Sequence, residues 1–188
     1  ALFTHIPGLK VVCPSTGADA KGLLKSAIRC DDPVVFLEHK LLYAKKEQIP
    51  DGEYLIPLGK ADVKRPGKDL TILTWSRQVY FSLEAAETLA AEGIDAEVIN
   101  MHTIKPIDAD LIVKSATKTG HVVTVEEHSV IGGLGSAVAD VLCEQCPTPL
   151  KKIGVNDTFG ESGPGAELLH KYGLDAANIV ATTKEFLA

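Results

Sequence analysis

Short apolar runs alternate with segments of helical periodicity along most of this chain. The runs at 9–13 and 34–37 are rich in β-branched residues and predict buried strands, and 18–28 carries apolar residues at helical spacing. A strand, a helix and a strand joined by short connections predict a right-handed parallel βαβ unit.

After residue 68 the alternation becomes regular. Apolar runs at 70–74, 96–99, 121–125 and 150–153 predict four strands, and helical periodicity marks 79–91, 108–115, 135–143, 166–172 and 175–187. Gly93 is expected to end the first of these helices, and Asp108 to cap the second. Because the strands are apolar almost throughout, they predict an open α/β domain whose parallel sheet is covered by helices on both faces.

The stretch 40–68 differs from both of its neighbours. It is polar and contains the turn sequence Pro50, Asp51 and Gly52, which together are typical of an interdomain linker. We expect a short strand around 55–58 inside it. The predicted organisation is therefore part of one α/β unit at 1–45, a linker at 46–68 and a second α/β domain at 69–188.

Composition excludes several classes of protein. With 45% hydrophobic and 23% charged residues, the 188-residue chain is unlike disordered, collagen-like or disulfide-scaffold sequences. Its formal net charge of -6 argues against nucleic acid as the main partner, and no apolar run is long enough to cross a membrane. The single methionine is Met101, so we expect Ala1 to mark a processing, cleavage or expression boundary.

Cys143 and Cys146 form a C-x-x-C pair that invites a redox or zinc interpretation. The pair follows a predicted helix and precedes Pro147, and a helix C-terminus does not favour a thiolate. Cys13 and Cys30 do not stand at zinc-finger spacing. We therefore expect a structural role for the pair, and a reducing compartment such as the cytoplasm or an organelle matrix.

A glycine-rich loop follows the predicted strand at 121–125 and opens the next helix. Loops at the carboxyl ends of strands bind ligands in open α/β sheets, and helix N-termini attract anions. The spacing of Gly132, Gly133 and Gly135 does not match the dinucleotide fingerprint. Two interpretations stay open: a tight turn with close helix–sheet packing, or a binding or interface loop.

Within that loop, His128 stands beside Glu126 and Glu127 and is the one candidate for proton transfer. Because adjacent strand residues point to opposite sides, only one of the two glutamates can face the imidazole. The second glycine-rich stretch, 157–165, is expected to be a surface turn. Further upstream, the carbonyls that end the helix at 18–28, with Asp31 or Asp32, could hold a hard cation.

Three stretches near the N-terminus resemble the E1 β subunit of thiamine diphosphate-dependent 2-oxoacid dehydrogenases, with the pyruvate and acetoin types nearest. They are HIPGLKVVCPS at 5–15, DAKGLLKSAIR at 19–29 and DPVVFLEH at 32–39, and in that family they end the pyrimidine-binding domain. The stretch 56–61 resembles the linker into the transketolase C-terminal domain. VEEHSVIGGLGSAV at 125–138 and FGESG at 159–163 resemble that domain and lean toward split transketolases.

The resemblance implies a transketolase C-terminal-like α/β fold preceded by part of a pyrimidine-binding α/β domain. It implies an enzyme that oxidatively decarboxylates a pyruvate-like 2-oxo acid and passes the acyl group to a lipoyl partner. The alternatives are a transketolase that moves two-carbon ketol units between sugar phosphates, and a non-catalytic assembly module when the chain is isolated. Thiamine diphosphate and Mg²⁺ would serve the full enzyme. The family's catalytic glutamate lies upstream of the matched stretches, so we expect the isolated chain to be inactive and not to bind the cofactor.

The resemblance also implies sites and partners. The substrate channel or interface would include Glu126, Glu127, His128, Gly132, Gly133 and Gly135. A potassium site, formed mainly by backbone, would use Ala27, Ile28, Cys30 and Asp32, with Cys30 where the family usually has Asp. The expected assembly is a homodimer or an α2β2 heterotetramer with an E1 α-like subunit, docking on an E2 lipoyl acyltransferase core. The compartment would be the cytoplasm or the mitochondrial or plastid matrix.

Overall fold

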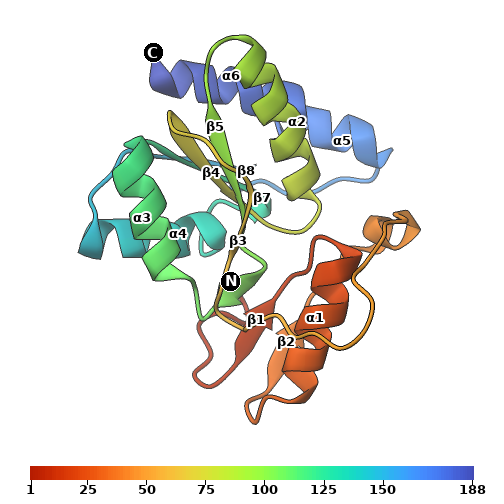
Figure 1. Cartoon of the computed structure of the whole chain (residues 1–188). Coiled ribbons are helices and arrows are strands. Elements are labelled where there is room, and N and C mark those ends of the chain that lie inside the picture. Colours follow the sequence, from red (N-terminus) through yellow and green to blue (C-terminus); the bar gives the residue numbers. More distant parts are fainter.

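A five-stranded sheet forms the larger part of the molecule in the computed structural model, which describes residues 1–188 (Figure 1). Its strands are β3 (Asp62–Arg65), β4 (Leu70–Thr74), β5 (Ala96–Asn100), β7 (Val122–Ser129) and β8 (Leu150–Val155). They lie in the order β3-β5-β4-β7-β8, and only β3 runs antiparallel to its neighbour. The prediction of an open, mainly parallel sheet is confirmed.

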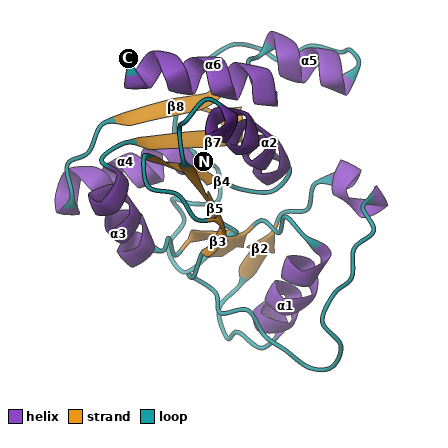
Figure 2. Ribbon diagram, turned by 45° about the horizontal axis from the view of Figure 1, so that its top comes forward, coloured by secondary structure: helices purple, strands orange, loops and turns teal.

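Helices cover both faces of this sheet, as predicted (Figure 2). On one face lie α2 (Gln78–Ala91), α5 (Gly165–Lys171) and α6 (Ala176–Leu187), and on the other α3 (Ala109–Thr119) and α4 (Leu134–Gln145). Successive strand residues feed the two cores in turn: Ile72 packs toward α2 and α6, and Leu73 toward α3 and α4. The alternation explains why the central strands carry apolar residues on both faces.

The residues predicted to end α2 and to cap α3 do so in the structure. Gly93 has a φ of +87° directly after α2, a backbone conformation that residues with a Cβ rarely adopt. Asp108 caps α3, because its side chain accepts a hydrogen bond from the Leu111 N–H at 3.3 Å.

A second, three-stranded sheet lies below the first in Figure 1. In it β1 (Lys10–Val12) and β2 (Val34–Phe36) are parallel and joined by α1 (Gly17–Ile28), which confirms the predicted βαβ unit. The third strand, β6 (Thr103–Lys105), follows β5 closely and pairs antiparallel with β1. A short 3₁₀ helix, η1 (Lys40–Ala44), follows β2. We call this sheet with α1 the small unit, and the five-stranded sheet with its helices the large unit.

The prediction of a short strand around 55–58 is wrong. Ile56 instead packs along α1, where its N–H donates to the Gly22 carbonyl at 3.3 Å and its own carbonyl accepts from Ser26 Oγ at 2.6 Å. The strand in this region is β3, a polar edge strand that pairs with β5. The domain boundaries at 45 and 68 remain a prediction. None of the helices is long and apolar enough to cross a bilayer.

Buried hydrogen bonds fix the small unit to the large one. Asp19 in α1 is only 3% exposed, and its Oδ2 accepts from the N–H groups of Ser15 and Thr16 at 3.1 Å each. The same oxygen accepts from Nδ2 of Asn100, the last residue of β5, at 2.9 Å. Ser15 Oγ completes the set by donating to Asn100 Oδ1 at 2.8 Å. These contacts join α1 to the carboxyl end of the large sheet.

We predict that Asp19→Ala lowers the free energy of unfolding by about 2 kcal/mol, because the Ser15, Thr16 and Asn100 donors lose a buried acceptor. Urea unfolding measures the loss. Asp140→Ala, at an exposed position of α4, is the matched control and should change the free energy by less than about 0.5 kcal/mol. Equal effects of the two substitutions would contradict this role for Asp19.

Candidate functional site

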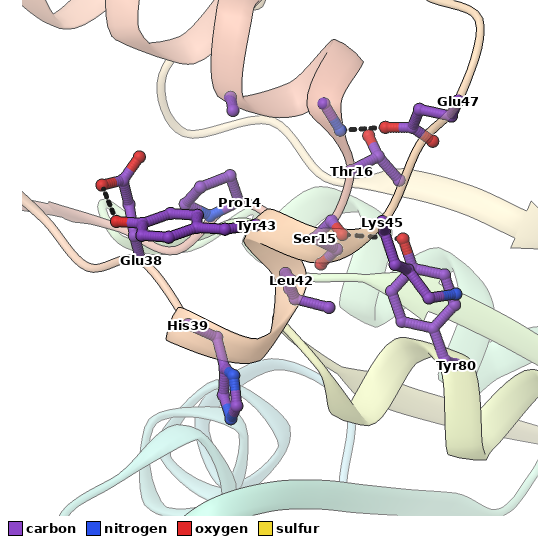
Figure 3. Close-up of a pocket in the computed structure, with 12 residues that line it drawn as sticks. Pro14, Ser15, Thr16, Glu38, His39, Leu42, Tyr43, Lys45, Glu47 and Tyr80 are labelled. Atoms are coloured by element: carbon purple, nitrogen blue, oxygen red, sulfur yellow. Dashed lines mark hydrogen bonds between the residues drawn. The ribbon is translucent and has the colours of Figure 1, made fainter.

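The carboxyl ends of four parallel strands meet in a groove between the two units. One cavity of about 260 Å³ is lined by residues that follow β1, β2 and β4 or stand near the end of β7: Cys13, Leu37, Glu38, His39, Trp75, Ser76, Arg77, Gln78, Glu127 and His128. A second cavity of about 200 Å³ shares Glu38 and His39 with the first (Figure 3). We call the two cavities together the junction groove. Its position outside the carboxyl ends of the strands is where open α/β sheets bind ligands.

The loop after β4 carries two unusual features of the groove. The strand order changes direction at β4, because β5 pairs with one edge of this strand and β7 with the other. Ser76 there has a φ of +51°, which is uncommon for a residue with a Cβ and costs conformational energy. Gln78 is 1% exposed, and neither atom of its amide has a hydrogen-bond partner. A strained backbone at Ser76 and an unpartnered buried amide at Gln78 therefore stand side by side at this end of the sheet.

The second cavity opens at the N-terminus of α1 (Figure 3). The Gly17 N–H donates to the carboxylate of Glu47, so a side chain of this chain occupies the anion-attracting end of the helix. The Lys45 ammonium lies 3.3 Å from the centroid of the Tyr80 ring, and Tyr80 donates to the Ser15 carbonyl at 2.9 Å. These contacts bring 45–47 over the cavity.

Glu126 organises the glycine-rich loop at the start of α4. It is fully buried, and its carboxylate accepts from the N–H groups of Leu134 at 2.7 Å and Gly135 at 2.8 Å. Burial, opposed by these two donors, raises the pKa of Glu126. Gly132 has a φ of +73°, and a Cβ on Gly133 would overlap the Glu126 carboxylate. The geometry therefore supports the tight-turn interpretation of the glycines, with Glu126 in the position where an anionic ligand would bind.

His128 faces one glutamate only, as expected. Its Nδ1 donates to the Ser129 carbonyl at 2.8 Å and lies 3.8 Å from Glu126 Oε2. Glu127 points to the opposite side, where its Oε2 is 3.3 Å from Nε2 of His39. His39 is not among the site residues predicted from the sequence, although its position just after a predicted strand is a signal of a site residue. The His39–Glu127 pair joins the two units across the groove.

The residues expected to hold potassium do gather at the end of α1. Cys30 N–H donates to the Ala27 carbonyl at 3.2 Å, so that oxygen already has one partner. The Lys10 ammonium lies 3.0 Å from Cys30 Sγ and 3.0 Å from Asp32 Oδ2, and these contacts raise the pKa of Lys10. The Lys10 ammonium thus pairs with the Asp32 carboxylate that would attract a cation, and a potassium ion would compete with Lys10 for these side chains.

The groups that would bind a magnesium diphosphate are also not assembled by these residues. No cluster of three or more His, Cys, Asp or Glu side chains has the geometry to hold a metal ion. The N-termini of α1 and α4 are occupied by carboxylates of Glu47 and Glu126. We therefore derive no catalytic step through thiamine diphosphate from this chain. The stretch 157–165 is exposed throughout, as predicted for a surface turn.

Comparison with known proteins matches both units to one superfamily. Residues 59–179 match the family model of the transketolase C-terminal domain, and residues 1–46 that of the transketolase pyrimidine binding domain. A solved chain described as a split gene transketolase, inactive beta4 tetramer, superposes with a TM-score of 0.88 and 44% identity, covering 99% of this chain and 60% of that one.

Several curated proteins are similar over most of this chain. The 2-oxoisovalerate dehydrogenase subunit beta of Bacillus subtilis is 44% identical over 177 residues, or 92% of this chain and 54% of the relative. The mitochondrial pyruvate dehydrogenase E1 component subunit beta of Dictyostelium discoideum is 54% identical, covering 81% and 45%. A 6-deoxy-6-sulfo-D-fructose transketolase subunit of Clostridium sp. is 43% identical, covering 98% and 56%. The chain spans about half the length of these relatives.

We predict that Glu126→Ala lowers the free energy of unfolding by about 2 kcal/mol, because two buried N–H groups at the start of α4 lose their acceptor. Glu127→Ala is the control, since the Glu127 side chain is 40% exposed, and it should cost less than about 1 kcal/mol. Chemical unfolding of both variants checks the difference, and an equal cost would show that Glu126 does not support the loop.

Glu126 also predicts a dependence on pH. Its pKa is raised in the folded chain above the unfolded value, here taken as 4.5, so the fold is less stable with Glu126 ionised than with Glu126 protonated. The stability of the wild type relative to Glu126→Gln should therefore increase as the pH falls from 7 through the folded pKa toward 4.5. A difference that stays constant over this range would contradict the raised pKa.

Proposed function

This chain belongs to the transketolase C-terminal domain family, and from that premise we propose that it is part of a thiamine diphosphate-dependent 2-oxoacid dehydrogenase of the E1 β type. The whole enzyme would oxidatively decarboxylate a pyruvate-like 2-oxo acid and transfer the acyl group to a lipoyl partner. One observation carries the proposal: both domain types follow each other on this chain, with 44–54% identity to dehydrogenase β subunits.

The arginines favour a 2-oxo acid over a sugar phosphate as substrate. A phosphate group is bound best by several convergent arginines or histidines. Arg29 pairs with Glu53 at 2.8 Å and Arg65 with Asp95 at 2.9 Å, both outside the junction groove. Of the arginines only Arg77 lines the groove, together with His39 and His128. His39 is already paired with Glu127 at 3.3 Å. A transketolase remains the second candidate function, supported by the similar split-gene transketolase structure.

We propose that this chain contributes the wall of the substrate channel or a subunit interface, with the loop at 126–135 at its edge. The bound thiazolium ring supplies the carbanion chemistry in such enzymes, and protein groups position the reactants. Here the His39–Glu127 pair would hold the two sides of the groove together. His128 Nε2, which lies 3.3 Å from the Ala1 amino group, would be the ring nitrogen that accepts a hydrogen bond at the mouth of the groove, since Nδ1 donates to the Ser129 carbonyl. The isolated chain would be inactive.

Exposed apolar side chains support assembly with other polypeptide. They concentrate in the small unit and the segment after it, where Leu24 and Ile28 project from α1 and Leu41 and Tyr43 from η1. Apolar surface of this kind is usually covered by a partner. We propose a homodimer or an α2β2 heterotetramer with an E1 α-like subunit, docking on an E2 lipoyl acyltransferase core. By analogy with relatives from bacteria and mitochondria, it would act in the cytoplasm or an organelle matrix.

We predict that the full enzyme turns over a 2-oxo acid with a lipoylated acceptor at a kcat/KM at least about tenfold above that for ketol transfer between pentose phosphates. Steady-state assays of both reactions on one preparation decide between them, and a higher value for pentose phosphates would select the transketolase.

Calorimetry on the isolated chain with thiamine diphosphate and Mg²⁺ should show no binding. Measurable affinity there would overturn our account of where the cofactor is held.

Potassium binding can be tested through thermal unfolding. We predict that KCl, compared with choline chloride, raises the midpoint of thermal unfolding more in Lys10→Met than in the wild type. The reason is that Cys30 and Asp32 then lose the ammonium that lies 3.0 Å from each. Lys114→Met, at an exposed position of α3, is the control and should leave the KCl effect unchanged. Equal potassium effects in Lys10→Met and the wild type would show that Lys10 and the cation do not compete.

A further inference from the structure

Two free thiols lie one turn apart at the C-terminal end of α4, whereas the junction groove lies near the N-terminal end of this helix. Cys143 is exposed on the last turn of the helix, and Cys146 is the partly exposed residue that caps it. The Cys146 N–H still donates to the Leu142 carbonyl at 3.0 Å, so the backbone stays helical up to this point. Residues three apart in an α-helix have Cα atoms about 5 Å apart. This spacing falls inside the range that disulfides span.

The backbone at Cys146 also permits the adjustment that a disulfide needs. Its φ of -155° and ψ of 76° lie outside the helical region, so this residue is not held by the helix on its far side. Helical geometry alone leaves the Cβ atoms of such a pair about 5–6 Å apart, more than a disulfide allows. Closing that gap takes a rotation at Cys146, which stands outside the helical region at the end of α4.

The two thiols have different surroundings. Cys146 Sγ lies 3.4 Å from Thr117 Oγ1 on α3 and 3.5 Å from Thr148 Oγ1. Since the Thr148 hydroxyl donates to the Cys146 carbonyl at 2.8 Å, Thr117 is the donor that remains for the sulfur. The hydroxyl contact of Thr117 is the largest cause that lowers the pKa of the Cys146 thiol, although a helix C-terminus alone would disfavour a thiolate.

We propose that Cys143 and Cys146 form a reversible oxidation site that reacts with hydroperoxides, with Cys146 as the attacking thiol and Cys143 as the resolving thiol. The Cys146 thiolate attacks one oxygen of the peroxide, the O–O bond breaks, and water or an alcohol leaves after protonation. Cys143 sulfur then attacks the Cys146 sulfenic acid, forms the S–S bond and releases water. The two thiols lose two electrons in total, and the peroxide gains them.

The oxidised form would differ from the reduced form at one contact between helices. A disulfide directs Cys146 Sγ toward Cys143 and away from Thr117, so α3 and α4 lose that contact. α4 begins at the loop that Glu126 holds beside the groove. The oxidation site thus lies at the opposite end of the helix that borders the candidate functional site.

The test is a titration of the full protein that carries this chain with hydrogen peroxide, followed by thiol counting and peptide mass spectrometry. We expect the thiols of this chain to fall from four to two, with Cys143 joined to Cys146, and dithiothreitol to restore all four. In Cys143→Ser the reaction should stop at a Cys146 sulfenic acid that dimedone traps. In Cys146→Ser the remaining thiol at 143 should stay reduced at the same peroxide dose.

Variants at exposed Thr117 separate the proposed activation from simple accessibility. Thr117→Val should slow the oxidation of Cys146 several-fold, and Thr117→Ser, which keeps the hydroxyl, should restore the wild-type rate. Cys30→Ser is the matched control and should leave the disulfide yield unchanged. Oxidation of Cys30 before the pair, or an equal rate in Thr117→Val and the wild type, would overturn the proposal. None of these readouts depends on the enzymatic activity proposed above.

Discussion

The buried hydrogen bonds that Asp19 and Ser15 make with Asn100 decide how the two sheets of this molecule meet. Asp19 lies in the first turn of α1 and Asn100 at the carboxyl end of β5, and both are buried. The Asp19 carboxylate has three donors around one oxygen, so the loop after β1 can take only one position relative to the large sheet. That position turns the carboxyl ends of β1 and β2 toward those of β4 and β7, and the junction groove is the space between them.

The chain fills its own helix N-termini with carboxylates. Glu126 does so for α4, and Glu47 contacts the first residue of α1. Each uses the N–H groups that bind diphosphates in other α/β folds. The arrangement is consistent with our proposal that this chain borders an active site and that the cofactor is held elsewhere. It also explains why a glycine-rich loop that looks like a ligand cradle in the sequence is a rigid turn in the structure.

The periodicity of the sequence was sufficient for most of the fold and insufficient for the site. Strands such as β4 are buried on both faces, so their apolar runs are unmistakable. β3 and β6 have four and three residues and carry polar side chains, so neither has a detectable pattern. The contacts of His39 with Glu127 and of Cys146 with Thr117 join separate elements. No local pattern encodes such pairs, because they exist only after the elements have packed.

β6 has a consequence for motion. Only Met101 and His102 separate it from β5, yet it pairs with β1 of the small unit, and Cys13 N–H donates to the His102 carbonyl at 2.9 Å. A hinge between the two sheets would have to break this strand pairing together with the buried Asp19 contacts. These contacts therefore oppose a hinge motion between the two units and favour a groove of constant width. Under the proposed function, any opening and closing of the groove would come from the loops at its rim, such as 45–53, or from neighbouring subunits.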